Sequence, residues 1–395
     1  MPLEMLKSLK IKLFLLPLFF LASLAANSEA QQVYYGGVGF ISWDDRDQLF
    51  PQSSKLLCRT ASTCSHGNID VMARPYFMEK TFSKFKLKTL VGEKQVEGVI
   101  MAPMIARESV GITEDITAGK KTYIHVYRIF ASVMFFEFGE GRFIASRPVV
   151  LQYTDVLDHP ASDAEQFSIF SDLVGTEKLG INLFKSLHEG ARDVDPSIVA
   201  EKFAQVIVNN LGESVKGVIS KGYKEASWKT QVGQIFESNL VKQTGAPLIP
   251  SMGQEQLGGE LQGTFRDASY KITLAEPFFR VALDVEVFKS FQKISGPKKT
   301  ICHAVKIGMR VGSELEEMMN AKFKRTQRSC TVVHVSKVMD PLFYFQGSLF
   351  SLLYRLSRQF GGKPLDGFLE AAAPGQTDVE KSIQRVKEEV FKVGL

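Results

Sequence analysis

The sequence predicts a mixed α+β fold, in which two sheet halves rich in β-hairpins are separated by a helical block and followed by C-terminal helices. The first observation behind this is a long hairpin pattern around the turn Gly139-Glu140-Gly141. The second is a return of alternating apolar and polar residues over 279–311. The third is a set of apolar stripes at helical spacing between these two regions.

We divide the 395 residues into five segments. They are a leader, 1–30, an N-terminal α/β domain, 31–160, a helical block, 161–245, a second β-rich domain, 246–340, and C-terminal helices, 341–395. The composition, with 45% hydrophobic and 23% charged residues, is that of a globular protein. It excludes a disordered tail protein, a collagen-like repeat and a multi-pass membrane protein.

The N-terminal domain opens with an apolar, glycine-rich segment, 33–43, that fits a buried strand. A short helix is expected around 75–85 and a second strand at 96–105. The long hairpin pairs 122–138 with 142–153, both rich in β-branched and aromatic residues. Both faces of its first strand are largely apolar, so we expect protein on each side.

The helical block contains four expected helices. Two lie at 164–174 and 179–191, the first of them opened by Ser162. A third follows Asp195-Pro196, because an apolar stripe there has helical spacing. This stripe consists of Ile198, Val199, Phe203, Val206, Ile207 and Leu211. A fourth stripe, from Trp228 to Leu240, ends at Gly245.

The second β-rich domain repeats the organisation of the first in outline. Strands are expected at 246–252, 279–287, 301–311 and 329–336, whereas 314–323 is left open between a helix and a loop. An apolar first strand followed by a long hairpin thus occurs in both 31–155 and 246–336. This similarity between the two segments has two alternative explanations: duplication, or the general frequency of strand and turn patterns.

Two helices are expected after residue 340. Asp340-Pro341 starts an apolar helix, 342–360, which polar side chains mark as buried in protein and not as a transmembrane span. Thr377 and Glu380 form a capping-box pattern before an amphipathic helix. Its stripe either packs on its own domain or binds a partner, and the candidate partner-binding residues are Val379, Ile383, Val386 and Val390.

The first thirty residues predict a secretory signal peptide. Lys7, Lys10 and Lys12 precede an uncharged apolar run, 13–26, and small residues before Gln31 suit a signal peptidase. The alternative is an uncleaved anchor, although the run is short for a membrane span. Cleavage before Gln31 leaves 45 basic and 41 acidic residues, a net charge of +4. No basic stripe is evident, so nucleic acid is disfavoured as a partner.

An exported chain with four cysteines predicts disulfides. We favour local pairing, Cys58 with Cys64 and Cys302 with Cys330, among the three possible connectivities. The spacing fits no tetrahedral zinc signature, so we expect no metal. The acidic cluster Asp44, Asp45 and Asp47 lacks the calcium-loop spacing and fits a solvated strand exit.

No local motif identifies a reaction. The Gly37-x-Gly39 pair lacks the third glycine of a dinucleotide fingerprint, and the phosphate-loop, nucleophile-elbow and H-E-x-x-H patterns do not occur. We therefore expect no cofactor and name no catalytic residue. Three strand histidines, His125, His303 and His334, would converge only if the fold brought them together, while His66 falls in a loop and His188 on a helix.

These observations favour an exported, non-enzymatic binding or assembly protein of the cell envelope with a protein partner. An exported hydrolase with a scattered site and a periplasmic ligand-binding protein are the alternatives. The strand–helix–hairpin order also resembles, at the level of fold and over about a third of the chain, the small α/β domains of envelope translocation and secretion-channel proteins.

Overall fold

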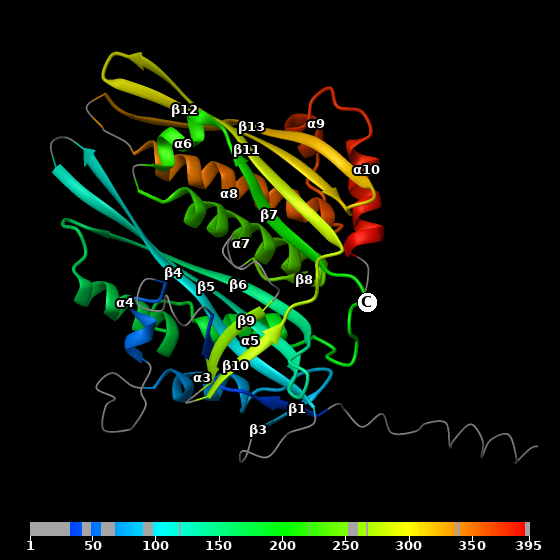
Figure 1. The fold of residues 1–395 in the computed structure, drawn as a ribbon. Coiled ribbons are helices and arrows are strands. Elements are labelled where there is room, and N and C mark those ends of the chain that lie inside the picture. Colours follow the sequence, from blue (N-terminus) through cyan, green and yellow to red (C-terminus); the bar gives the residue numbers. More distant parts are fainter. Residues whose placement is uncertain are drawn as a thin grey trace, which may run out of the picture. The chain divides into compact units, whose positions relative to one another are not determined.

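Two mixed sheets with helices packed on them form the part of the chain that the structure, a computed structural model, describes (Figure 1). This part comprises residues 32–41, 49–56, 68–89, 98–117, 120–220, 222–251, 260–265, 268–335, 337 and 340–391. Contacts group the chain from Gln32 onwards into one unit. The fold class is mixed α+β, which confirms the sequence prediction. The predicted leader, Cys58, Cys64, His66 and the Asp44–Asp47 cluster lie outside the described residues.

The first sheet has the strand order β3-β1-β4-β5-β6. Its strands are β1, Gln32–Tyr35, β2, Gly39–Phe40, β3, Lys86–Thr89, β4, Val99–Thr117, β5, Lys120–Glu137, and β6, Phe143–Leu157. β1 runs parallel to both β3 and β4, and β2 extends the parallel pairing along β4. β4, β5 and β6 are antiparallel, so the predicted long hairpin is confirmed.

Both faces of this hairpin are covered, as its apolar composition predicts. Tyr127, Ile129 and Val133 pack with the helices on one face. These helices are α3, Ile69–Phe77, α4, Asp163–Gly175, and α5, Leu183–Ala191, with a short 3-10 helix at Ser53–Leu56. On the other face Met134 and Phe136 form a smaller core that includes residues from the second half of the chain.

The second sheet has the order β13-β12-β11-β7-β8. Its strands are β7, Ala204–Leu211, β8, Leu248–Ile249, β11, Phe279–Ser295, β12, Lys298–Gly312, and β13, Glu317–His334. β7 is parallel to β8 and β11, whereas β11, β12 and β13 are antiparallel. A separate two-stranded sheet pairs β9, Glu260–Phe265, with β10, Ala268–Thr273.

The two large sheets have the same topology. In each, a strand (β1 or β7) is parallel to the strand that follows its helix (β3 or β8) and to the first strand of an antiparallel trio. The intervening helix is α3 in one half and α7, Glu225–Thr244, in the other. A helix also follows each trio, α4 after β6 and α8, Pro341–Phe360, after β13. The repeated order of strands and helices therefore extends through nearly the whole described chain.

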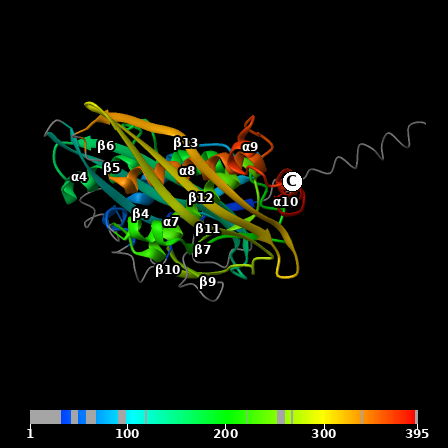
Figure 2. The same ribbon diagram turned by 90° about the horizontal axis from the view of Figure 1, so that it is seen from above.

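Helices α7 and α8 contact each other and lie between the two sheets (Figures 1 and 2). α7 contacts β6 on one side and β7 on the other, so even its polar residues Gln231, Gln234 and Glu237 are buried. α6, Glu213–Ile219, α9, Phe368–Ala372, and α10, Val379–Val386, complete the second half, and α10 continues into a π-helical turn, Lys387–Phe391. None of the helices in the described part of the chain has the length and apolar character needed to cross a bilayer.

The helix predicted after Asp195-Pro196 is wrong, since this segment holds a turn and then β7. Ala204, Val206 and Val208 are buried at every second position of the strand. β7 lies between β8 and β11, and its other face is only partly buried but includes the apolar Ile207 between Val206 and Val208. Apolar residues then occur in runs that also match a spacing of three or four residues. Asp195 caps a local turn, in which its carboxylate accepts the N–H of Ser197 at 3.0 Å.

Three other local expectations need correction. The helix expected around 75–85 lies earlier, because Asn68 caps α3 by accepting the N–H of Asp70. The segment 314–323 contains the start of β13. The capping box of Thr377 and Glu380 is not formed: Asp378 is the N-cap of α10, with φ of 67° and no side-chain cap. The Ser162 and Asp340 helix starts are confirmed.

Candidate functional site: a groove along the edge of β6

β6 is the last strand of the first sheet, and among the residues that the structure describes no strand pairs with its outer edge over most of its length. Pro148 lies within this strand, which agrees with an edge position because proline cannot donate a ladder hydrogen bond. α5 packs against one face of β6 and α7 against the other. The strand edge is therefore the floor of a groove between two helices.

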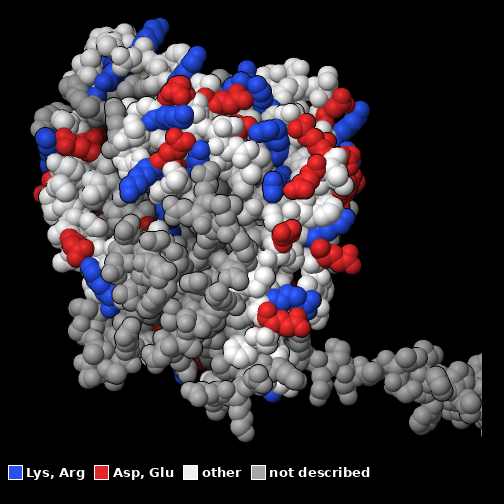
Figure 3. Space-filling model, in the orientation of Figure 1, with Lys and Arg blue, Asp and Glu red and all other residues white. Residues whose placement is uncertain are grey.

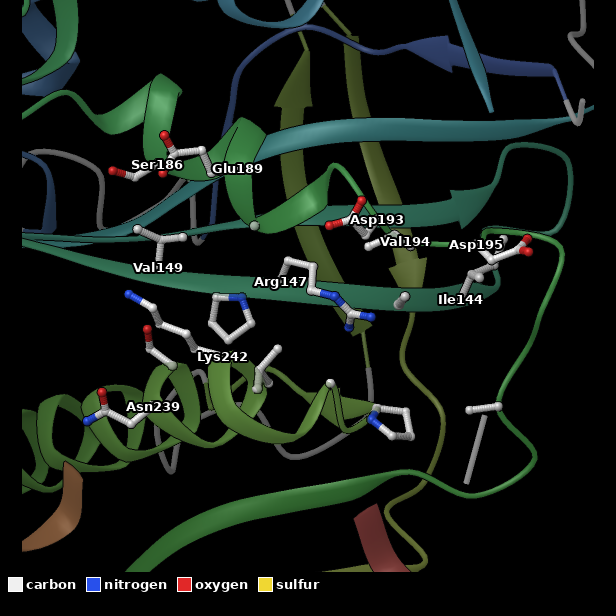
Figure 4. A pocket seen from close by; sticks show the side chains of 18 of the residues that line it. Ile144, Arg147, Val149, Ser186, Glu189, Asp193, Val194, Asp195, Asn239 and Lys242 are labelled. Carbon is white, nitrogen blue, oxygen red and sulfur yellow. The ribbon is translucent and has the colours of Figure 1, made fainter. Parts of the chain in front are cut away.

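The groove has a volume of about 750 Å³ and is open to solvent (Figure 4). Residues from both faces of β6 line it, including Val150 on one face and Arg147 and Val149 on the other, together with Ile144 at a bulge near the start of the strand. α5 contributes Ser186, Glu189 and Gly190, α7 contributes Ser238, Asn239, Val241 and Lys242, and the segment after α5 contributes Asp193, Val194, Asp195, Ile198 and Ala200. The two helices thus contribute mainly polar side chains, and the apolar lining comes mainly from β6 and the segment after α5.

Arg147 is the most unusual of the charged groups in the lining. Burial lowers the pKa of its guanidinium below the ordinary arginine value. Its Nη1 donates to the backbone oxygen of Ser146 at 3.0 Å, and within the described residues no carboxylate forms an ion pair with it. A partly buried arginine without an anion is unfavourable, because desolvation of the charge is not compensated. Figure 4 shows its side chain extending into the groove between α5 and α7.

Five other charged residues line the groove, and they differ in how far they are satisfied: Lys84, Glu189, Asp193, Asp195 and Lys242. Asp193 accepts hydrogen bonds from Ser83 and Arg192, and Asp195 accepts from Ser197. Lys242, on the opposite wall from α5, has no ion pair within the described part of the chain. The two aspartates are therefore already occupied locally, whereas the cations Arg147 and Lys242 are available to an anionic ligand.

The α7 wall is held in place by a buried polar network. Ser251 donates its backbone N–H to Glu237 at 2.8 Å and its hydroxyl to the oxygen of Val206 at 2.7 Å. Its own backbone oxygen accepts from Gln234 at 2.9 Å. Burial raises the pKa of Glu237 to about 7. Ser146 of β6 also donates to the oxygen of Leu248 at 2.9 Å, so the floor of the groove is bonded to the second sheet.

The strand histidines do not gather into one site. His125 lies beneath the start of α4, where its Nε2 accepts the N–H of Ala161 at 2.9 Å. His303 lies in the other core, stacked between the rings of Phe288 and Tyr344. His188 on α5 packs against Phe82 and Phe77. Among the described residues no three His, Cys, Asp or Glu side chains are grouped as a metal site would require.

Two other predicted residue sets are placed by the structure. The sulfur atoms of Cys302 and Cys330 lie 2.00 Å apart, a disulfide distance, and the two residues face each other on β12 and β13. The four residues of the α10 stripe are buried in the core of the second half: Val379, Ile383, Val386 and Val390. This packing on its own domain is one of the two alternatives considered for the stripe, and it leaves those side chains covered.

Sequence reasoning did not find the groove. Its lining comes from four separate segments, and no spacing rule links them. Two signals were nevertheless present. Pro148 in a strand pattern indicates an edge, and Arg147 interrupts an apolar run on a face that is otherwise covered. Together they indicate an exposed edge with a charge beside it, but not the helices that enclose it.

Comparisons with known proteins add no family assignment. No family model matches the chain, and no curated protein matches it. Among solved structures, one described as an Ntf2-like protein involved in plasmid conjugation aligns over 60% of this chain and 78% of its own, at 8% identity. Its TM-score is 0.10, too low to carry any argument about fold or function.

Proposed function

We propose that this protein is an exported, non-enzymatic binding or assembly protein of the cell envelope. It holds an extended peptide segment of a partner protein in the groove along β6. The segment is mostly apolar and has one acidic side chain that reaches Arg147. The single observation that carries this proposal is the position of Arg147, a desolvated cation without an acidic partner in the described chain, beside an unpaired strand edge.

An unpaired edge supports strand addition because alternate residues direct their N–H and C=O groups away from the neighbouring strand. A peptide that pairs with this edge gains main-chain hydrogen bonds, and side-chain contacts supply specificity. Pro148 removes one donor, so the added strand pairs on either side of it. The apolar walls formed by Val149, Val194 and Val241 suit alternate apolar side chains of the peptide.

The envelope location is carried by the leader pattern of residues 1–30 and by the cysteine content. The pairing of Cys302 with Cys330 agrees with an oxidising compartment. Export predicts that the protein isolated from the envelope begins at Gln31. Amino-terminal sequencing that finds Met1 retained on that protein contradicts cleavage of the leader.

The same groove bears on the two alternative functions, a ligand-binding protein and a hydrolase. A periplasmic ligand-binding protein would use it for a small molecule, and its volume of about 750 Å³ lies within the range of such sites. An exported hydrolase needs a nucleophile or a general base beside the substrate. The lining includes the hydroxyls of Ser186 and Ser238 and three carboxylates but neither histidine nor cysteine, and Ser186 donates to the backbone oxygen of Asn182 at 3.0 Å and not to a lining carboxylate. The proposal favours a peptide because the groove is open to solvent and follows a strand edge.

The test is a selection of random peptides of strand length, displayed on phage, against the full chain and against Arg147→Glu. The wild-type protein is expected to enrich peptides in which one Asp or Glu is flanked by apolar residues. Arg147→Glu is expected to lose that acidic residue and to gain Lys or Arg in its place. Lys185→Glu on the exposed side of α5, outside the groove lining, is the matched charge control. Identical peptides from wild type and Arg147→Glu overturn the proposal.

A further inference from the structure

The far ends of β11 and β12 extend beyond the helices that cover the second sheet. Every residue from Lys289 to Lys298 is exposed, on both faces of the ribbon. Phe291 and Ile294 are each 57% exposed, and Val332 on the adjacent β13 is 60% exposed. We call residues 289–298 together with Val332 the ribbon tip. Large apolar side chains in such a position need an explanation, because nothing in the described chain covers them.

The charge of the ribbon tip is of one sign. Lys289, Lys293 and Lys298 are exposed and form no ion pair with any described residue. The sequence contains no Asp or Glu between Glu286 and Glu314. The protruding end at the upper left of Figure 3 shows blue side chains among white ones. The tip therefore combines apolar side chains with uncompensated positive charge.

The equivalent hairpin of the first half provides an internal comparison. Its turn has the same register, with Thr117 opposite Lys120 where the second half has Ser295 opposite Lys298. Counting from the turn, Thr113-Glu114-Asp115 takes the place of Phe291-Gln292-Lys293. Glu114 pairs with Lys121 at 2.9 Å and Asp115 with Lys337 at 2.7 Å. The shared topology thus requires neither the phenylalanine nor the unpaired lysines.

We propose that the ribbon tip docks on the surface of an anionic lipid bilayer. Phe291 and Val332, which share one face of the ribbon with the three lysines, enter the boundary between headgroups and acyl chains, while the lysines extend to the level of the anionic headgroups. A uniformly positive surface complements a uniformly negative one, which favours a membrane over the mixed charges of a typical protein partner. This inference is independent of the groove and goes beyond the proposed function.

The hydrogen bonding of the ribbon makes this insertion feasible. β11 and β12 remain paired up to Ser295 and Lys298, so the backbone groups on the facing edges of these two strands are satisfied at the tip. The outer edge of β11 has no partner strand among the described residues beyond Val285, so the backbone stays at the hydrated level of the headgroups and only side chains enter the boundary. The disulfide between Cys302 and Cys330 joins β13 to β12 beside Phe291, because Phe291 and Cys302 are directly opposite each other on β11 and β12. This fixes Val332 next to the tip.

The test measures where the full chain meets vesicles. Phe291→Trp and Val156→Trp are prepared, because Val156 is 59% exposed at the corresponding end of the first sheet. Each variant is mixed with vesicles of phosphatidylcholine, with and without phosphatidylglycerol, that contain brominated acyl chains. The fluorescence that the introduced tryptophan adds to that of the native tryptophans is expected to be quenched for Phe291→Trp in the anionic vesicles only. Val156→Trp is expected to remain unquenched.

Charge removal gives the second readout. Lys289→Gln, Lys293→Gln and Lys298→Gln together are expected to weaken binding to the anionic vesicles by roughly fivefold per lysine. Lys120→Gln, the equivalent of Lys298 in the first half, is expected to leave binding unchanged. Residues 1–31 are the same in every variant, so their contribution cancels. Absence of quenching at position 291, equal quenching in neutral vesicles, or full binding by the triple variant overturns the proposal.

Discussion

His125 and His303 occupy equivalent positions in the two halves of the chain: each is the sixth residue of the central strand of its antiparallel trio. The strands begin with the same residues, Lys120-Lys121-Thr122 and Lys298-Lys299-Thr300. Each histidine is buried beneath the start of the helix that follows its trio, at Ala161 before α4 and at Tyr344 in α8. This match of sequence and place supports duplication of one ancestral unit.

The two histidines differ in hydrogen bonding, which predicts opposite effects of replacement by phenylalanine. His125→Phe is expected to destabilise the fold by about 1–3 kcal/mol, because the N–H of Ala161 loses its acceptor. His303 has two ring nitrogens without a partner in the described chain and stacks between two aromatic rings. His303→Phe is expected to change stability by less than about 1 kcal/mol, or to raise it. Urea unfolding at neutral pH measures both.

The same pair predicts a pH dependence. Burial lowers the pKa of His303, so its folded state binds fewer protons than the unfolded chain below about pH 6.5. The stability associated with the neutral ring is present above that pH and is lost as the pH falls. Wild type is therefore expected to lose more stability than His303→Phe between about pH 7.5 and about pH 5.5. Equal losses would contradict a buried neutral His303.

Glu237 predicts a dependence of the opposite sign. Burial raises its pKa to about 7, so the folded state retains a proton that the unfolded chain releases above about pH 4.5. The contribution of the protonated Glu237 to stability is fully present below about pH 4.5 and is lost as the pH rises towards about 7. Glu237→Gln is expected to stabilise the protein by on the order of 1–3 kcal/mol above pH 7 and to give no gain near pH 5. Glu213→Gln, on the exposed side of α6, is the control with little effect at either pH.

The disulfide is expected to stabilise the second half. Cys302 and Cys330 are 28 residues apart, and closing such a loop in the unfolded chain contributes about 3.6 kcal/mol. Cys302→Ser with Cys330→Ser is expected to lower the free energy of unfolding by up to that amount. A peptide map without reductant should contain one linked pair of peptides from β12 and β13. Free thiols at both positions would contradict the pairing.

The exposed edge of β13 predicts an effect on association. Lys322 donates its backbone N–H to the side-chain oxygen of Gln376 at 2.9 Å, and the side-chain nitrogen of Gln376 donates back to the oxygen of Lys322. The amide thereby occupies one pairing position on an edge strand. Gln376→Ala is expected to change stability by less than about 1 kcal/mol but to increase association with concentration. Light scattering compares it with Gln384→Ala on α10, and equal association of the two would contradict this role.

Much of the fold follows from local sequence patterns, and the exceptions have physical causes. The β5–β6 hairpin is predictable because its β-branched residues and glycine turn are local signals. β7 is not, since the apolar Ile207 interrupts the period of two that Gln205 and Asn209 would set, and Val206, Ile207 and Leu211 also match a helix. The core position of Val379 and Ile383 was one of two alternatives, because amphipathicity alone does not name the surface that covers a helix.

The candidate site was beyond local reasoning for a different reason. Arg147 and Lys242 meet in one groove only after β6, α5 and α7 have packed together, and they are far apart in the chain. The repeated Lys-Lys-Thr and histidine pattern was a stronger clue to the architecture than the coarse echo of strands. An alignment of the two halves of the chain with each other identifies this pattern and predicts that they share a topology.

Hydrogen exchange of the protein with and without a peptide selected on it tests the central claim most directly. Strand addition in the groove predicts that backbone amides of β6 between Ile144 and Val150 exchange more slowly in the complex, apart from Pro148, which has none. Amides of the ribbon tip should be unchanged. Slower exchange confined to other elements, with β6 unaffected, would contradict the assignment of this groove as the peptide-binding site.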